Sequence, residues 1–271
     1  MPELPEVETT RRGIAPLLVG RRVVSVDVRE PRLRWPIPPA LARDLPGHRV
    51  RSVTRRAKFL LLESPVGHVI LHLGMSGSLR VVSGNLPPEK HDHLDVLMDD
   101  GRCLRFRDPR RFGAALWTTE DPLGHPLLKN LGPEPLGGAF NADWLHRRAR
   151  DRRVAVKPFL MNSQIVAGVG NIYASESLFL AGIHPGRPAG RISLKRYQRL
   201  VLAVREVLED AIAAGGTTLR DFVDSNGDPG YFAQQLRVYG RQNKACLHCG
   251  SLVRSRVIGQ RSSYFCPRCQ R

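Results

Sequence analysis

Four of the five cysteines stand in two closely spaced pairs near the C-terminal end of the sequence. The pattern is Cys246-x2-Cys249, then 16 residues, then Cys266-x2-Cys269. Two such turns joined by a hairpin bring four thiolates together, and four thiolates form the closed tetrahedral site of a structural zinc ion. The spacing therefore predicts one structural Zn²⁺. His248 is an alternative ligand that four cysteines make unnecessary.

The hairpin between the cysteine pairs carries Arg254, Arg256 and Arg261. A charged, solvated turn would explain them. In a chain of formal net charge +17, however, an arginine-tipped zinc hairpin favours a finger that lies in a DNA groove.

The N-terminus is the second feature with chemical potential. The sequence begins Met1-Pro2-Glu3, and methionine before a residue as small as proline is normally removed. The mature chain would then begin with the free secondary amine of Pro2. The alternative is an ordinary first helical turn, in which proline is well tolerated.

A third candidate lies in the stretch GVGNIYASE. It lacks the third glycine and the preceding strand of a dinucleotide site, so a helix–turn–helix is the better interpretation. Asn171 is expected to cap the second helix, whose N–H groups would hold a phosphate. Glu176 shares a face with apolar residues and needs a partner or a function. The five arginines within 146–153 predict a patch that contacts the DNA backbone.

Other candidates come from the first half of the chain. Met75, Arg110 and Phe112 each stand beside turn-forming glycine or proline. They are either loop anchors or wedges that fill the hole left when a base leaves the stack. His91 and His93 have metal-ligand spacing but no clear third ligand, so a metal site is disfavoured there.

The elements that must position these residues fall into two classes, so the fold class is α+β. A helix is expected over residues 3–19, kinked or ended early by Pro16. Alternating runs over about 21–120 predict an antiparallel β-sandwich or barrel, and 142–214 is helical in pattern. Residues 217–236 are loop-rich. We divide the chain into 1–133, 134–236 and a zinc module, 237–271.

Composition narrows the class of partner. The chain has 42 Lys+Arg against 25 Asp+Glu, which favours a polyanion, nucleic acid first. No apolar run is long enough to span a bilayer and no signal pattern is visible, so we expect no membrane and a cytoplasmic, DNA-associated protein.

Taken together, the motifs resemble the formamidopyrimidine-DNA glycosylase family, which includes the endonuclease VIII enzymes. The resemblance rests, in order, on PELPEVET, the lysine of RRAKFLLLE, HLGMSGSLR, PEKHDH, DPRRFG, LGPEP, GVGNIYASE, GGTTLRDF, GYF and the CxxC pairs. The opening PELPEVE and the Arg110–Phe112 pair favour the formamidopyrimidine branch. The resemblance implies an N-terminal β-sandwich with a leading helix, then a helical domain with a helix–two-turn–helix and a four-cysteine zinc-finger hairpin.

The resemblance also implies an activity: a bifunctional DNA glycosylase and abasic-site lyase of base excision repair that flips and removes oxidised purines. It assigns the nucleophile to Pro2 and general acid/base work to Glu3. Lys58, in a strand-like run, would donate the proton of the first elimination and Arg261 that of the second. Further implied roles are phosphate contacts, orientation of the nucleophile's surroundings, and closure of loop 217–236 over the base. The phosphate contacts are His91, Arg110, Arg152 and Asn171, and the orienting residues are Glu6 and Glu176.

Two rival functions remain open at this stage. One is a glycosylase of the endonuclease VIII type that prefers oxidised pyrimidines. The other is a non-catalytic zinc-finger DNA-binding protein, which would need neither a free Pro2 nor Glu3. In each case the expected partner is double-stranded DNA, damaged DNA for the enzymes, and the expected state is a monomer.

Overall fold

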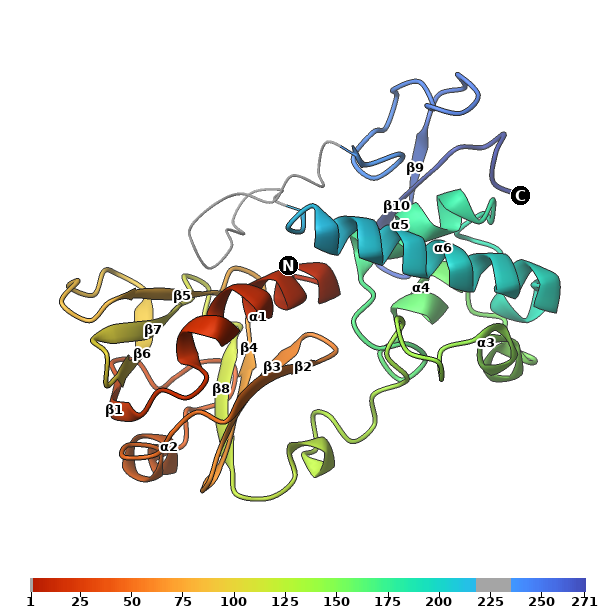
Figure 1. The fold of residues 1–271 in the computed structure, drawn as a ribbon. Coiled ribbons are helices and arrows are strands. Elements are labelled where there is room, and N and C mark those ends of the chain that lie inside the picture. The colour runs from red at the N-terminus through yellow and green to blue at the C-terminus, as the bar shows by residue number, and fades with distance from the viewer. Residues whose placement is uncertain (1, 218–234) are drawn as a thin grey trace. The chain divides into compact units, whose positions relative to one another are not determined.

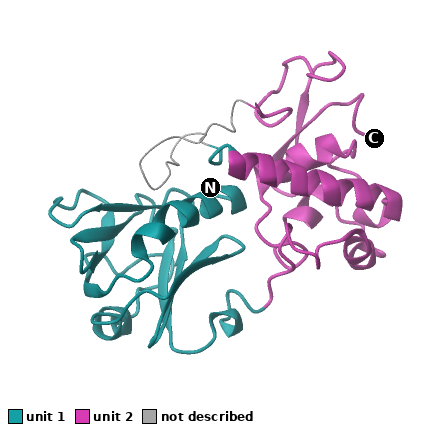
Figure 2. Ribbon diagram, viewed as in Figure 1, with its two compact units in different colours: residues 1–129, 214–233 teal, residues 130–213, 234–271 magenta. Residues whose placement is uncertain are grey.

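The computed structural model describes residues 2–217 and 235–271. The chain forms two compact units, shown in Figure 2. Unit 1 comprises residues 1–129 and 214–233, and unit 2 comprises 130–213 and 234–271. The expected division into 1–133, 134–236 and 237–271 stays a prediction.

Unit 1 is built from two four-stranded antiparallel sheets and a leading helix (Figure 1). One sheet has the order β1-β6-β7-β5 and the other β2-β3-β4-β8. Two short helices, α2 (Pro39–Asp44) and η1 (Pro122–Gly124), lie in the connections. The remaining bounds are α1 Leu4–Leu18, β1 Val23–Val28, β2 Ser52–Arg56, β3 Phe59–Ser64, β4 Gly67–His72, β5 Ser78–Ser83, β6 Asp92–Met98, β7 Arg102–Arg107 and β8 Ala114–Thr118.

The alternation of the strand sequences explains the sandwich. In β7, Leu104 and Phe106 belong to the apolar core, while Arg105 points to the opposite face and binds Asp95 through two nitrogens at 2.9 and 2.8 Å. The core also takes Val7, Ile14 and Leu18 from α1. The α+β expectation with an antiparallel sandwich is confirmed. The fifth cysteine, Cys103, is a buried residue of β7, and burial raises the pKa of its thiol to about 11.

One of the two effects expected of Pro16 was wrong. The leading helix is not ended early by Pro16, which lies inside α1 as the helix runs on to Leu18, while a kink at this residue stays a prediction. The cost of one missing N–H is tolerable close to the end of a helix. Gly20, at φ +83°, then turns the chain away, as expected. Helix α2 was missed because its sequence begins among prolines.

Unit 2 is helical with one β-hairpin. Its elements are α3 (Ala142–Ala149), α4 (Val156–Met161), α5 (Asn171–Leu180), η2 (Ala189–Arg191), α6 (Leu194–Ala213), β9 (Arg254–Ile258) and β10 (Arg261–Phe265). The apolar pattern over 144–162 suggested a continuous helix, but the chain leaves α3 at Arg150 and Asp151 adopts φ +59°. Helix α6 packs on both α3 and α5 and buries Tyr197 and Leu200.

Candidate active site

The N-terminal residues are fixed by a reciprocal cap at the start of α1. The backbone N–H of Glu3 donates to Oε2 of Glu6 at 2.7 Å, and the Glu3 carboxylate accepts from the Glu6 backbone. The other Glu6 oxygen accepts from the backbone N–H of Thr217 at 2.8 Å. Pro2 is buried, and both glutamates are 2 % exposed. The structure therefore brings Pro2, Glu3 and Glu6 together at the positive end of a helix.

Lys58 lies in the turn between β2 and β3, not in a strand as its sequence context suggested. Ala57, just before it, has φ +54°, which breaks the strand pattern. Lys58 is half-buried in this turn.

His72 is a further candidate site residue, which was not predicted from the sequence. It pairs with Phe59 across β3 and β4, and the two ring centroids lie 4.8 Å apart. Burial, with the positive charges of Lys58 and Arg34, lowers the His72 pKa to about 4. The ring is therefore neutral near pH 7. Its Nδ1 faces the backbone N–H of Gly74 at 3.0 Å and accepts from it, which assigns the proton to Nε2. Its position directly before the glycine turn of HLGM was the available signal.

The three predicted wedge residues come from two loops that touch. A Cβ added to Gly74 would lie 2.5 Å from the backbone of both Phe112 and Gly113, so only glycine permits this approach. Met75 follows Gly74 directly. Phe112 is 44 % exposed, and the Arg110 guanidinium lies 5.1 Å from its ring centroid. An exposed aromatic stacked by a cation is a suitable surface for a base or a gap in a base stack.

Asp108 joins these loops and was not identified from the sequence. Its carboxylate is fully buried. It accepts from the Ser76 hydroxyl at 2.9 Å, from the Arg110 backbone N–H at 3.3 Å and from the Gly113 backbone N–H at 2.7 Å. One buried anion thus holds both loops in register.

His91 lies beside the same loops. Its carbonyl accepts from the Asp108 backbone N–H at 3.0 Å, and its φ of +77° turns the chain sharply. Partial burial and the nearby charges of Lys90 and Arg107 lower its pKa. His93 is buried and instead bonds the Asp108 carbonyl through Nε2 at 2.8 Å. The two histidines therefore have different surroundings.

In unit 2, helix α5 carries two of the predicted residues. Asn171 is its first residue and Gly170 is the N-cap, so the expectation that the Asn171 side chain caps the helix was wrong. Its Nδ2 lies 3.4 Å from the Tyr239 hydroxyl, while its buried Oδ1 has no hydrogen-bond partner within residues 2–217 and 235–271. A single ligand donor would satisfy that oxygen.

Glu176 has its partners within unit 2. The side chain is fully buried and accepts three backbone N–H groups, from Arg237 at 2.8 Å, Val238 at 3.0 Å and Tyr239 at 2.8 Å. Burial raises its pKa. These three hydrogen bonds hold residues 237–239 against α5, close to Asn171.

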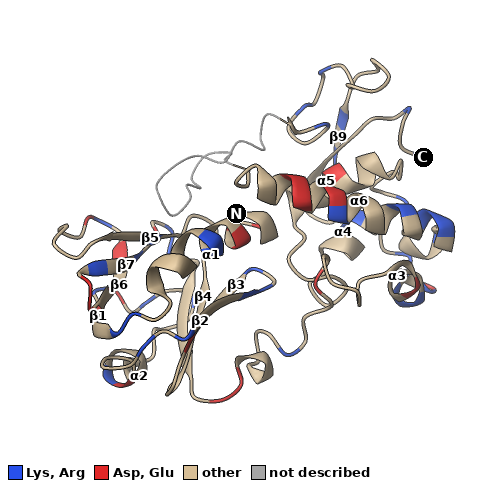
Figure 3. Cartoon of the chain, in the orientation of Figure 1, with Lys and Arg blue, Asp and Glu red and all other residues tan. Residues whose placement is uncertain are grey.

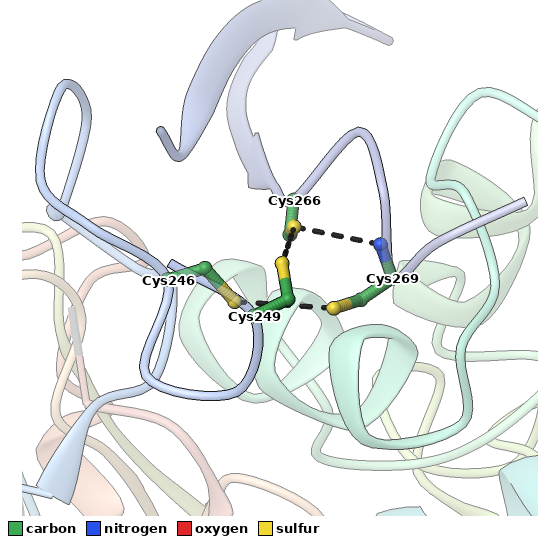
Figure 4. A group of neighbouring side chains, drawn as sticks. All are labelled: Cys246, Cys249, Cys266 and Cys269. Atoms are coloured by element: carbon green, nitrogen blue, oxygen red, sulfur yellow. Dashed lines mark hydrogen bonds between the residues drawn. The ribbon is translucent and has the colours of Figure 1, made fainter. Parts of the chain in front are cut away.

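The four hairpin cysteines converge as expected (Figure 4). Their Sγ atoms all lie within 4.8 Å of one another, with Cys246–Cys269 at 4.0 Å and Cys249–Cys266 at 3.5 Å. A tetrahedron with Zn–S bonds of about 2.3 Å has edges of about 3.8 Å, so the arrangement fits zinc. Four thiolates leave no open coordination position, and the ion is structural. Among the described residues this is the one group suited to a metal.

The β9–β10 hairpin lies between the two cysteine pairs and is anchored to α4 by a lysine that was not predicted from the sequence. Lys157 is fully buried, and its Nζ donates to the Ser262 carbonyl at 2.7 Å and to the Ser263 hydroxyl at 2.8 Å. Arg261, the neighbouring residue, is exposed at the start of β10. Arg152 is exposed beyond α3, and its carbonyl accepts from Gly190.

Loop 217–236, expected to close over a flipped base, lies outside the described residues except at its ends. Within the described chain, no helix combines the length and apolar character needed to cross a membrane.

Comparisons with known proteins agree with this arrangement. Residues 1–115 match the formamidopyrimidine-DNA glycosylase N-terminal domain, 131–223 its H2TH domain and 243–271 the zinc finger found in FPG and IleRS. The formamidopyrimidine-DNA glycosylases of Alkalilimnicola ehrlichii and Thioalkalivibrio sulfidiphilus are each 62 % identical to the chain, with full coverage of both sequences.

Solved structures give the same result. The MutM (Fpg) protein of Thermus thermophilus is 40 % identical with a TM-score of 0.89, covering 99 % of this chain and 98 % of its own. Lactococcus lactis Fpg in complex with abasic-site DNA is 33 % identical with a TM-score of 0.92, covering 99 % of both chains. The chain therefore belongs to the formamidopyrimidine-DNA glycosylase family.

Proposed function

We propose that the protein is a bifunctional DNA glycosylase and abasic-site lyase that removes oxidised purines in base excision repair. The observation that carries the proposal is the buried N-terminus, where Pro2 adjoins the Glu3–Glu6 cap. The solved complexes of Lactococcus lactis Fpg with abasic-site and Fapy-dG DNA support the class of substrate.

The chemistry begins at Pro2. Its secondary amine forms a bond to C1′ of the damaged nucleotide as the bond from C1′ to the base breaks. The nitrogen then loses its proton, and the C1′–O4′ bond of the sugar ring breaks as O4′ takes up a proton, which leaves an iminium ion between Pro2 and C1′. A secondary amine reaches this state without losing a second proton from nitrogen. Glu3 exchanges protons with the sugar and the departing base. Glu6 holds the Glu3 backbone and so fixes the position of both residues.

Strand cleavage follows from the iminium ion. The positive nitrogen acidifies C2′, so loss of that proton expels the 3′ phosphate, and a second elimination expels the 5′ phosphate. We assign proton donation to Lys58 in the first step and to Arg261 in the second. The turn position of the half-buried Lys58 and the exposed start of β10 suit these roles.

DNA is held by cations and neutral donors from both units. We assign phosphate contacts to His91, Arg110, Arg152 and Asn171, and add the Nε2–H of His72, which is neutral and lies close to Lys58. Met75 and Phe112, with Arg110, fill the space that the flipped base leaves. Within unit 2, Glu176 holds residues 237–239 next to Asn171.

The zinc ion supplies no chemistry to the reaction. Cys246, Cys249, Cys266 and Cys269 would hold it, and its effect is to fix the hairpin that carries Arg261. We further propose that the protein acts as a monomer in the cytoplasm. The endonuclease VIII alternative, with oxidised pyrimidines as substrate, is disfavoured by the PELPEVE opening. A non-catalytic DNA-binding protein is disfavoured because it would not need the buried cap that Glu3 and Glu6 form beside Pro2.

Borohydride trapping tests the proposal directly. An iminium ion is reduced by hydride to a stable amine, so adding borohydride during turnover of an 8-oxoguanine duplex should yield a protein–DNA adduct at Pro2. A variant that retains an N-terminal extension should bind the duplex yet neither excise nor trap. An adduct that peptide mapping places at Lys58, or normal trapping by the extended protein, would contradict the assignment. A matched thymine glycol duplex distinguishes the two branches of the family.

A further inference from the structure

The positive charge of the chain is concentrated in unit 2. That unit carries 20 of the 42 Lys and Arg but 7 of the 25 Asp and Glu, so it holds +13 of the net +17. Figure 3 shows basic residues gathered along α3 and at the N-terminal end of α6. The residues that the proposed function uses account for only part of this excess.

Most arginines of unit 1 are neutralised within the fold. Examples are Arg21 with Asp100 at 3.1 Å, and Arg29 with Asp95 at 2.8 Å. Ion pairs of this kind also hold Arg11, Arg12, Arg32, Arg43, Arg49, Arg55, Arg102, Arg105, Arg107 and Arg111. These charges serve the unit's own structure.

A contrasting group lies on unit 2, on what we name the α3–α6 surface. Two backbone bonds join its halves: Gly190 donates to the Arg152 carbonyl at 3.0 Å and Ala189 to the Val154 carbonyl at 2.9 Å. The surface consists of six exposed cations, Arg147, Arg150, Arg153, Arg191, Lys195 and Arg199. Within the part of the chain that the structure describes, none of the six forms an ion pair with an acidic side chain.

The position of Lys195 is unfavourable for the fold. It stands in the first turn of α6, where the helix dipole disfavours positive charge, and the exposed Arg191 and Arg199 flank it in the chain. The neighbouring Arg196 shows the crowding, because burial together with Arg187 and Arg199 lowers its pKa. By contrast, Arg147 lies at the C-terminal end of α3, where the dipole favours it. Neither an ion pair among the described residues nor the helix dipole therefore explains Lys195 and Arg199.

We propose that the α3–α6 surface binds the phosphate backbone of duplex DNA independently of sequence and of damage. Duplex DNA presents one negative charge per roughly 1.7 Å of its axis, so it is the polyanion best matched to a row of unpaired cations. The inference rests on the proposed function only in taking DNA as the partner. It assigns Arg191, Lys195 and Arg199 to affinity and to search on undamaged DNA, with no part in base removal.

The test compares two triple variants of equal charge. One is Arg191→Gln, Lys195→Gln and Arg199→Gln. The control is Arg21→Gln, Arg43→Gln and Arg49→Gln, which removes three exposed but ion-paired arginines of unit 1. Affinity for an undamaged duplex is measured by fluorescence anisotropy over a range of salt concentrations.

The slope of log K against log salt is negative, and each lost phosphate contact makes it less negative by about 0.9. The slope of the α6 variant should therefore be less negative than that of wild type by as much as about 2.7. The same relation gives about fivefold weaker binding per lost contact at about 0.15 M salt. The control should keep the wild-type slope. A wild-type slope in the α6 variant, or an equal loss in both variants, would overturn the proposal.

Two further readouts separate this inference from other causes. The α6 variant should melt no lower than wild type, because Lys195 opposes the helix dipole and none of the three replaced cations forms an ion pair with an acidic side chain among the described residues. Its single-turnover rate on a saturating 8-oxoguanine duplex should match wild type. If the wild-type protein itself neither excises nor traps, the proposed function fails, whereas the salt dependence on undamaged DNA still decides this inference.

Discussion

The buried carboxylate of Asp108 offers the sharpest test of what holds together the two loops that carry the proposed wedge residues Met75, Arg110 and Phe112. In Asp108→Asn one acceptor oxygen becomes an N–H donor, while the three donors that face it remain: the Ser76 hydroxyl and the backbone N–H groups of Arg110 and Gly113. At least one hydrogen bond to a charged acceptor is lost, at a cost of about 1.5–3 kcal/mol. If that cost falls on the loop arrangement, its population drops by about 10- to 150-fold.

The disturbed loop arrangement should slow base excision more than it slows strand cleavage at an abasic site. In the proposed role, Met75, Arg110 and Phe112 must be in place for a base to be extruded, whereas an abasic site has no base to extrude. Single-turnover excision of 8-oxoguanine should therefore slow by at least about tenfold relative to cleavage of a ready-made abasic site. Urea unfolding should show a drop in unfolding free energy of the same about 1.5–3 kcal/mol.

Asp27→Asn is the matched control, since Asp27 is an exposed carboxylate on the same sheet. It should leave both rates and the stability unchanged. Equal slowing of the two reactions by Asp108→Asn would show that Asp108 acts on catalysis or global folding. An unchanged ratio with lowered stability would equally refute its role in holding the wedges.

Three other predictions follow from the site. Cys249→Ser or strong chelation should abolish tight DNA binding, measured by anisotropy, while circular dichroism shows the sandwich of unit 1 intact; full binding after verified zinc loss would contradict this. Phe112→Ala and Met75→Ala should slow excision of 8-oxoguanine more than abasic-site cleavage in single-turnover assays, and equal losses would count against wedges. Stability should fall as pH drops from about 6.5 to about 4, because unfolded His72 binds a proton that folded His72, with a pKa of about 4, does not. Below about pH 4.5 stability should fall further, because Glu8 has a pKa of about 2 in the folded protein and the unfolded chain binds its proton first. In urea unfolding at a series of pH values, His72→Gln should lose only the fall in stability between about pH 6.5 and about pH 4.

The regular elements were predictable because their signals are local. Alternating apolar residues such as those of β7 face one core, and a CxxC pair is itself a turn that presents two thiolates. The strands, the leading helix and the zinc cluster therefore follow from the sequence. The same reasoning failed where one unusual backbone angle decides the structure, as at Ala57 before Lys58 and at Asp151 after α3.

The buried charges Asp108 and Lys157 could not be predicted from local sequence patterns, and the reason is a different one. Asp108 and Lys157 act through partners far away in the sequence: Ser76 lies 32 residues from Asp108, and Ser263 lies 106 residues from Lys157. Nothing in their neighbouring residues indicates that such a charge will be buried and paired. His72 shows an intermediate case, in which the adjacent glycine turn marked the region but not the role.

The contact between Glu6 and Thr217 has a consequence for the synthesis of the protein. The two residues are 211 positions apart, and residues 130–213 between them fold as unit 2. At about 5–20 residues per second, the ribosome needs roughly 10–40 s after making Glu6 to supply its partner. The cap beside Pro2 is therefore completed late in translation, after the sheets of unit 1 can already have formed. In a nascent chain bound to the ribosome, the proposed nucleophile Pro2 would lack this last contact of the cap, and the enzyme would become competent only near the end of its own synthesis.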